Sequence, residues 1–98
     1  MYAPAMAKET YAYRRLERVI KGFANHRRLQ ILELLKREPE LSVEEISERL
    51  KIGYMNTSDH LRKMAITGLL LKRSDGTSVR HKLTVRAELI LVFCKKLE

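Results

Sequence analysis

Apolar residues recur at helical spacing near the start of the chain. They follow the i, i+3, i+4, i+7 pattern of one helix face and are Leu16, Val19, Ile20 and Phe23. We therefore predict a helix that begins at Lys8. Residues 1–7 show no such pattern, and we expect them to form a disordered tail.

A second apolar segment follows the break after Gly22. Asn25 is a residue type that caps helices, and we predict a helix from His26 to about Arg37. Leucine and isoleucine cover more than one face of this segment, so we expect it to lie in the middle of the fold.

Two further helices are predicted on either side of a tight turn. Ser42 is followed three positions later by Glu45, the capping-box arrangement that begins a helix. Ile52-Gly53 predicts the turn, and residues 54–67 form the second helix, which ends before Gly68. A short helix, a turn and a second helix make a helix-turn-helix. The inner face of the second helix is predicted to carry Thr57, Leu61, Met64 and Ala65.

The periodicity changes after this point. Residues 69–73 are a strand candidate, and residues 79–85 alternate between apolar and polar, with His81 on the apolar side. Asp75-Gly76 between them is a strong hairpin signal. From about Arg86 the chain is apolar again, and we interpret this run as a helix, although it could also be a buried strand.

Together these elements predict one domain over residues 8–98. A chain of 98 residues has the usual size of a single domain. The expected fold is mostly α with a small β-hairpin (α+β), in the order α-α-α-α-β-β-α. A helix-turn-helix followed by a hairpin is a winged helix-turn-helix.

The formal net charge of +8 is distributed unevenly. Residues 38–53 carry two Lys/Arg and five Asp/Glu, whereas residues 54–86 carry seven Lys/Arg and two Asp/Glu. The second helix of the motif and the hairpin are therefore positive, as binding to the phosphates of DNA requires. We predict double-stranded DNA as the partner.

The predicted recognition helix, about 54–67, would enter the major groove, and the predicted wing, about 69–85, would contact the flanking backbone. Asn56 and Arg62 have side chains able to read adenine and guanine edges, and phosphates are assigned to Tyr54, Ser58 and Lys63. The residues expected to face DNA are Tyr54, Met55, Asn56, Ser58, Asp59, Arg62 and Lys63 on the helix, and Arg73, Thr77 and Arg80 in the wing.

Several segments together resemble the arsenical-resistance repressor (ArsR) family of winged-helix regulators. They are Asn25–Leu35, Leu41–Ile46, Ser58–Leu61 and Gly68–Leu70, followed by the wing. The resemblance implies a homodimeric transcriptional regulator, most often a repressor, whose recognition helices enter successive major grooves of a near-palindromic site. It also implies that Ser58 and His60 face DNA. Asp59 departs from the family pattern, which often has a basic residue there.

The last helix carries apolar residues nearly all round, more than one small domain can cover. We expect the same helix of a partner subunit to bury the surplus, with help from the first helix. The alternative is that the wing and the second helix already hide it. The expected interface residues are Leu16, Val19, Ile20, Leu89, Ile90, Phe93 and Leu97. The surplus also leaves room for a small-molecule effector of unknown identity.

Other functions find little support in the sequence. Sensors of the ArsR family often hold metal through paired cysteines, but Ser42 and Glu44 stand at those places and Cys94 is the only cysteine, so we expect neither a metal nor a cofactor. We expect Cys94 and His81 to be buried. No membrane or secretion segment is recognised, which favours the cytoplasm, and no catalytic set is present, so an enzyme is not expected. The alternative function is a winged-helix module that contacts protein or RNA.

Overall fold

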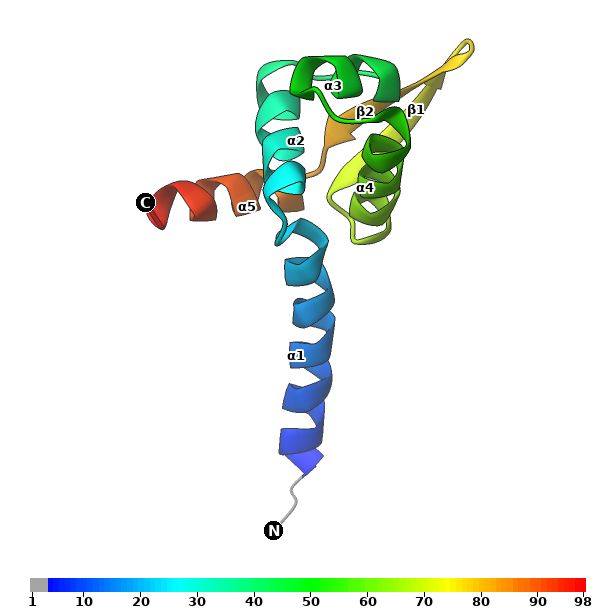
Figure 1. Ribbon diagram of the computed structural model, residues 1–98. Helices are drawn as coiled ribbons and strands as arrows, with labels where there is room; N and C mark the ends of the chain where they lie inside the picture. The colour runs from blue at the N-terminus through cyan, green and yellow to red at the C-terminus, as the bar shows by residue number, and fades with distance from the viewer. Residues whose placement is uncertain (1–3) are drawn as a thin grey trace.

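The computed structural model describes residues 4–98, with side chains from Thr10 onward. Over this range the chain forms α1 (Pro4–Phe23), α2 (His26–Arg37), α3 (Val43–Leu50), α4 (Tyr54–Ile66), β1 (Leu70–Asp75), β2 (Ser78–Leu83) and α5 (Val85–Lys96) (Figure 1). The order confirms the predicted α-α-α-α-β-β-α arrangement of a winged helix-turn-helix. The last apolar run is a helix, not a strand.

Side-chain caps begin three of the helices. The Asn25 Oδ1 accepts the backbone N–H of Arg27 at 2.9 Å, which begins α2 as predicted. At α3, the Ser42 Oγ accepts the Glu45 N–H at 3.2 Å, and a Glu45 carboxylate oxygen accepts the Ser42 N–H at 3.0 Å, so the capping box is confirmed. At α5, the Thr84 Oγ1 accepts the Ala87 N–H at 3.2 Å.

The core surrounds α2, which lies centrally as predicted. Its buried members are Ile31, Leu32, Leu34, Leu35, Leu41, Ile46, Leu61, Met64, Leu69, Leu70, Ala87, Ile90 and Leu91. His81 joins this core at 1% exposure, and its Nδ1 lies 2.9 Å from the Leu41 carbonyl oxygen. The predicted core position of His81 is therefore confirmed, and its ring does not lose a hydrogen-bond partner on burial.

The hairpin is joined to the loop between α2 and α3. β1 and β2 pair antiparallel, with Asp75 opposite Ser78, and Gly76 adopts φ +64° in the turn. The His81 N–H donates to the Leu41 carbonyl and the Glu40 N–H donates to the His81 carbonyl, both at 3.0 Å. These two backbone bonds fix the base of the wing against the helix-turn-helix.

Several local predictions need correction. Helix α1 begins at Pro4 instead of Lys8, so residues 4–7 are helical, while the rest of the predicted tail lies outside the described residues. Val85 is the first residue of α5 and is exposed, because the Thr84 cap ends the strand. Cys94 is half-buried.

Helix α1 extends far from the body of the protein (Figure 1). The molecule measures 55 × 32 × 22 Å, and its radius of gyration is 15.6 Å, against about 13 Å for a compact domain of this length. Every side chain from Thr10 to Arg18 is exposed. Residues 10–18 of this helix are therefore hardly covered by the rest of the protomer.

Candidate nucleic-acid interface

Helix α4 has one buried face and one exposed face. Thr57, Leu61 and Met64 are buried in the core, and the Thr57 hydroxyl donates to the Gly53 carbonyl at 3.0 Å. Ala65 is partly buried against the same core. Because this face is fixed, the other points to solvent, and the predicted DNA-facing residues that it exposes are Tyr54, Met55, Asn56, Arg62 and Lys63.

Asp59 lies among the cations of this exposed face. Its carboxylate accepts hydrogen bonds from the guanidinium of Arg62 and from the Lys63 ammonium, the latter at 3.1 Å. The bond from Arg62, followed by that from Lys63, lowers the pKa of Asp59. The negative charge is thus balanced locally, which reduces its repulsion of a phosphate backbone and holds both cations on one face.

His60 does not face outward as the family resemblance implies. It is half-buried, and the Arg28 Nε–H donates to its Nδ1 at 3.1 Å. Burial lowers the pKa of His60, and the positive charge of Arg28 lowers it further. Arg28 also donates to the carbonyls of Lys21 and Gly22, at 3.2 and 3.4 Å, so His60 belongs to the junction of α1, α2 and α4.

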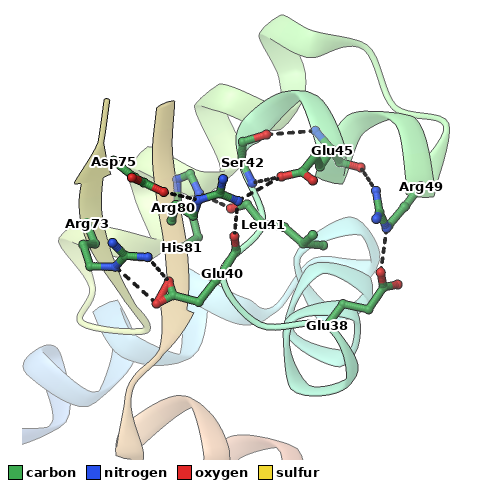
Figure 2. A network of polar contacts seen from close by, with 10 residues as sticks. All are labelled: Glu38, Glu40, Leu41, Ser42, Glu45, Arg49, Arg73, Asp75, Arg80 and His81. Atoms are coloured by element: carbon green, nitrogen blue, oxygen red, sulfur yellow. Dashed lines mark hydrogen bonds and ion pairs between the residues drawn. The ribbon is translucent and has the colours of Figure 1, made fainter. Parts of the chain in front are cut away.

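The two arginines predicted to contact DNA from the wing are engaged in a network within the protein (Figure 2). Arg80 donates to Asp75 and to the Glu40 carbonyl, both at 3.0 Å, and lies 3.5 Å from the Glu45 carboxylate. Arg73 lies 3.4 Å from the Glu40 carboxylate. These contacts join the wing to the loop before α3 and to the first turn of α3. Both arginines therefore stabilise the position of the wing.

Other wing residues are better placed to reach a backbone. Thr77 is exposed at the hairpin turn. Lys72, which is not among the predicted DNA contacts, pairs with His81 across the hairpin. It is exposed and has no ion-pair partner among the described residues. Arg73, the next residue along β1, pairs instead with Arg80.

Apolar side chains remain exposed on α5 and α1. They are Leu89, Val92, Phe93 and Leu97 on α5 and Leu16 and Ile20 on α1, each at least 44% exposed. Of the predicted interface residues, Ile90 lies in the core instead, and Val19 is partly buried against it. The wing and α2 therefore leave most of the apolar side chains on the outer face of α5 exposed.

The start of α5 is bonded to the end of α4. The Arg86 guanidinium donates to the Thr67 carbonyl at 2.8 Å, and the Thr84 hydroxyl donates to the Gly68 carbonyl at 2.7 Å. Gly68 adopts φ +76°, which lets the chain leave the helix. The recognition-helix candidate and the exposed apolar helix are therefore held together by hydrogen bonds.

The described residues offer little for a metal site or a membrane span. No group of three or more His, Cys, Asp or Glu side chains able to hold a metal ion occurs in the described part of the chain. The Ser42 hydroxyl, at one place where the family's metal sensors have cysteine, is used as a helix cap. Within residues 4–98, none of the helices has the length and apolar character needed to cross a membrane.

The order of elements, the exposed face of α4 and the attached hairpin define a winged helix-turn-helix domain. A family model described as "Bacterial regulatory protein, arsR family" matches residues 25–72. The transcriptional activator HlyU of Vibrio cholerae is 39% identical over 66 residues, which are 67% of this chain and 60% of that protein. This chain belongs to the arsR family of bacterial regulatory proteins.

Solved structures agree with this assignment. The structure of HlyU from Vibrio cholerae N16961 has a TM-score of 0.76 at 31% identity, with 88% of this chain and 94% of that chain covered. The homodimeric winged helix-turn-helix DNA-binding domain of Mb0332 from Mycobacterium bovis has a TM-score of 0.83 at 24% identity, with 99% and 87% covered. The second likeness supports the fold.

Proposed function

We propose that the protein is a homodimeric transcriptional regulator that binds double-stranded DNA, with α4 in the major groove and the β1–β2 wing on the flanking backbone. The observation that carries this proposal is the division of α4 into two faces. Leu61 and Met64 hold one face in the core, while the other presents Asn56, Arg62 and Lys63 to solvent. Asn56 and Arg62 would read base edges, and Lys63 and Lys72 would bind phosphates.

The proposed dimer uses the apolar faces of α5 and α1. Leu89 and Phe93 are one helical turn apart on α5, and both are more than half exposed. A second copy of the chain would bury them against its own equivalent residues in a two-fold interface. Such a dimer would carry two α4 helices, as a near-palindromic DNA site with half-sites about one helical turn apart requires.

The first experiment is a selection of duplexes from a random pool at two salt concentrations. Enrichment of a near-palindrome whose affinity falls steeply with salt would support the proposal. Binding without enrichment would indicate a protein that binds DNA without reading its sequence. Absence of binding at either salt would contradict the proposal and favour a module that contacts protein or RNA.

The sign of regulation needs a separate measurement. The family resemblance favours repression, whereas the relative HlyU is named an activator. A reporter gene placed under the selected operator distinguishes the two, because a repressor lowers and an activator raises expression when the protein is supplied.

A further inference from the structure

A basic hollow lies where α1 crosses the end of α4. Gly22 approaches Thr67 so closely that a Cβ on the glycine would stand 2.5 Å from the Thr67 Oγ1. Around this crossing is a hollow of about 280 Å³, lined by Arg18, Lys21, Gly22, Arg28, Lys63, Ile66 and Thr67. Four of the seven lining residues are cationic and none is acidic, and carbon atoms of the lining side chains form most of the wall.

The face of α1 that meets α4 stays basic beyond the crossing. Residues four, seven and eight positions before Gly22 share its side of the helix, and these are Arg18, Arg15 and Arg14. All three are exposed. The Arg15 guanidinium lies over the Tyr11 ring, 5.2 Å from its centre. The basic face therefore continues from the hollow along the projecting part of α1.

Few acidic groups offset this charge. Lys21 lies 3.8 Å from the Glu17 carboxylate, and Lys63 lies 3.1 Å from that of Asp59. Arg14 and Arg18 have no ion-pair partner among the residues whose side chains the structure describes. Such a surplus of positive charge on exposed side chains attracts polyanions.

The position of this surface relative to α4 favours one occupant. Tyr54, at the beginning of α4, borders a hollow together with Thr77 and Val79 of the wing. Lys63, near the other end, borders the hollow with Arg18 of α1. The wing and α1 therefore flank opposite ends of α4, with the projecting α1 continuing away from the body (Figure 1). DNA that receives α4 in its groove would bring backbone phosphates to both ends of the helix.

We propose that Arg14, Arg18 and Lys21 of α1, together with Lys63, bind phosphates of the DNA backbone beside the groove that α4 enters. The proposal rests on the proposed function and adds a third contact element to α4 and the wing. The hollow is a surface depression in which Arg18, Lys21 and Lys63 are exposed, while Arg28 is half-buried and bonded within the protein. Exposed cations suit a phosphate that remains part of a long strand. These contacts carry no base preference.

The test compares two double variants of equal charge. Arg18→Gln with Lys21→Gln removes two cations from the α1 face, and Arg37→Gln with Lys95→Gln removes two from the hollow between α2 and α5. The affinity of each for the selected operator and for a scrambled duplex is measured over a range of salt concentrations. We expect the first variant to lower the slope of log affinity against log salt by up to about 1.8, or 0.9 per lost phosphate contact. Both duplexes should be weakened equally.

Each outcome decides the proposal. Equal slopes for the two variants, with parent protein that binds DNA, would overturn the α1 contact and leave the proposed function intact. Parent protein that binds no duplex would overturn both. A further measurement adds inorganic phosphate at constant ionic strength and records the melting temperature of the parent and of the α1 variant. If phosphate stabilises only the parent while the DNA slopes of the two double variants stay equal, the hollow binds a free anion and the proposed DNA contact is wrong. Arg14→Gln with Arg18→Gln, which leaves Lys21 intact, should reproduce the expected loss of slope.

Discussion

The Arg28 guanidinium donates a hydrogen bond to the His60 Nδ1 across 32 positions of sequence. A nitrogen that accepts this bond carries no proton, so the imidazole is neutral in the folded protein. Protonation would remove the acceptor and place two positive charges side by side, next to Lys63 and Arg27, with only Asp59 to oppose them. The bond that joins α2 to α4 is therefore sensitive to pH.

We predict that the protein loses stability as the pH falls below about 6.5. Burial is the first cause that lowers the folded-state pKa of both His60 and His81 from the usual 6.5. The unfolded chain then binds more protons than the folded chain, so the free energy of unfolding is full above pH 6.5 and decreases below it. The pKa values of Glu45 and Asp59 are also lowered, but these two groups add to the loss of stability only when the pH falls below their usual values of 4.5 and 3.8. Melting temperatures at pH values of about 7.5 and 5.5 measure the loss.

His60→Asn is the matched variant for this measurement. The asparagine oxygen can accept the Arg28 hydrogen bond near the place of Nδ1 but does not titrate. The variant should lose less melting temperature between the two pH values than the parent, with His81 responsible for the remainder. An equal loss in both proteins would show that His60 is not responsible.

Gly22→Ala should destabilise the protein by about 1–3 kcal/mol, since the new methyl group overlaps the Thr67 side chain. The better helix propensity of alanine offsets part of this cost. Chemical denaturation measures the difference. Gly53→Ser is the control: Gly53 precedes α4 with nothing within 4 Å of a Cβ and no side-chain cap, so serine there should be neutral or stabilising. A Gly22→Ala protein as stable as the parent would contradict the close crossing.

Leu61→Ala should cost roughly 2–5 kcal/mol of folding stability, because Leu61 is 1% exposed and packs in the core. Met55, on the same helix, is 78% exposed, so Met55→Ala should change stability by less than about 0.5 kcal/mol. Urea denaturation of the two variants tests which face of α4 is buried. Similar losses in both would mean that this orientation is wrong.

Phe93→Glu should abolish the dimer, because a charge in an apolar two-fold interface lies against the same charge of the partner subunit. The protomer should remain folded, because Phe93 is exposed in the single chain. Sedimentation velocity measures the assembly, and circular dichroism the fold. Ile66→Glu places the same charge on the exposed end of α4 and should leave the dimer intact. A Phe93→Glu protein that still dimerises would exclude this face of α5.

Arg62→Ala should weaken binding to the selected operator by about 1–3 kcal/mol and relax the base preference at one position, if its guanidinium contacts guanine. Arg37→Ala, a matched exposed arginine on α2, should have little effect on base preference. Repeating the duplex selection with each variant gives the measurement. Unchanged selectivity for Arg62→Ala would assign Arg62 to a role within the protein, such as its ion pair with Asp59.

Local signals account for what could be predicted from the sequence. Asn25 and Ser42 cap helices through hydrogen bonds to residues two or three positions away, and such motifs are legible without the fold. Hydrophobic periodicity likewise revealed the buried face of α4 and the central place of α2. The fold class followed because short-range signals predicted the elements in order, with only the last apolar run left open between helix and strand.

The site was harder to predict because its contacts are distant in sequence. Arg80 meets the Glu40 carbonyl 40 positions away, and Arg28 meets His60 32 positions away. A sequence shows that an arginine is present, but it does not show which carboxylate or carbonyl accepts the hydrogen bonds of its guanidinium. The partners of Arg80 and His60 within the protein could therefore not be predicted. The exposed Lys72, which has no ion-pair partner among the described residues, was not among the predicted DNA contacts. Ile90 was likewise assigned to the interface because a uniformly apolar helix does not reveal which side faces the core.

The hydrogen bonds from Thr84 and Arg86 to the carbonyls of Gly68 and Thr67, directly after α4, have a consequence for the DNA site. If α5 joins the two subunits, each recognition helix is bonded directly to the dimer interface. The distance and the angle between the two recognition helices are then fixed. Inserting one base pair between the half-sites moves them about 3.4 Å farther apart and turns one relative to the other. Two recognition helices held at a fixed distance and angle cannot follow that change. We therefore expect the regulator to tolerate altered bases in the centre of its operator far better than an altered number of them.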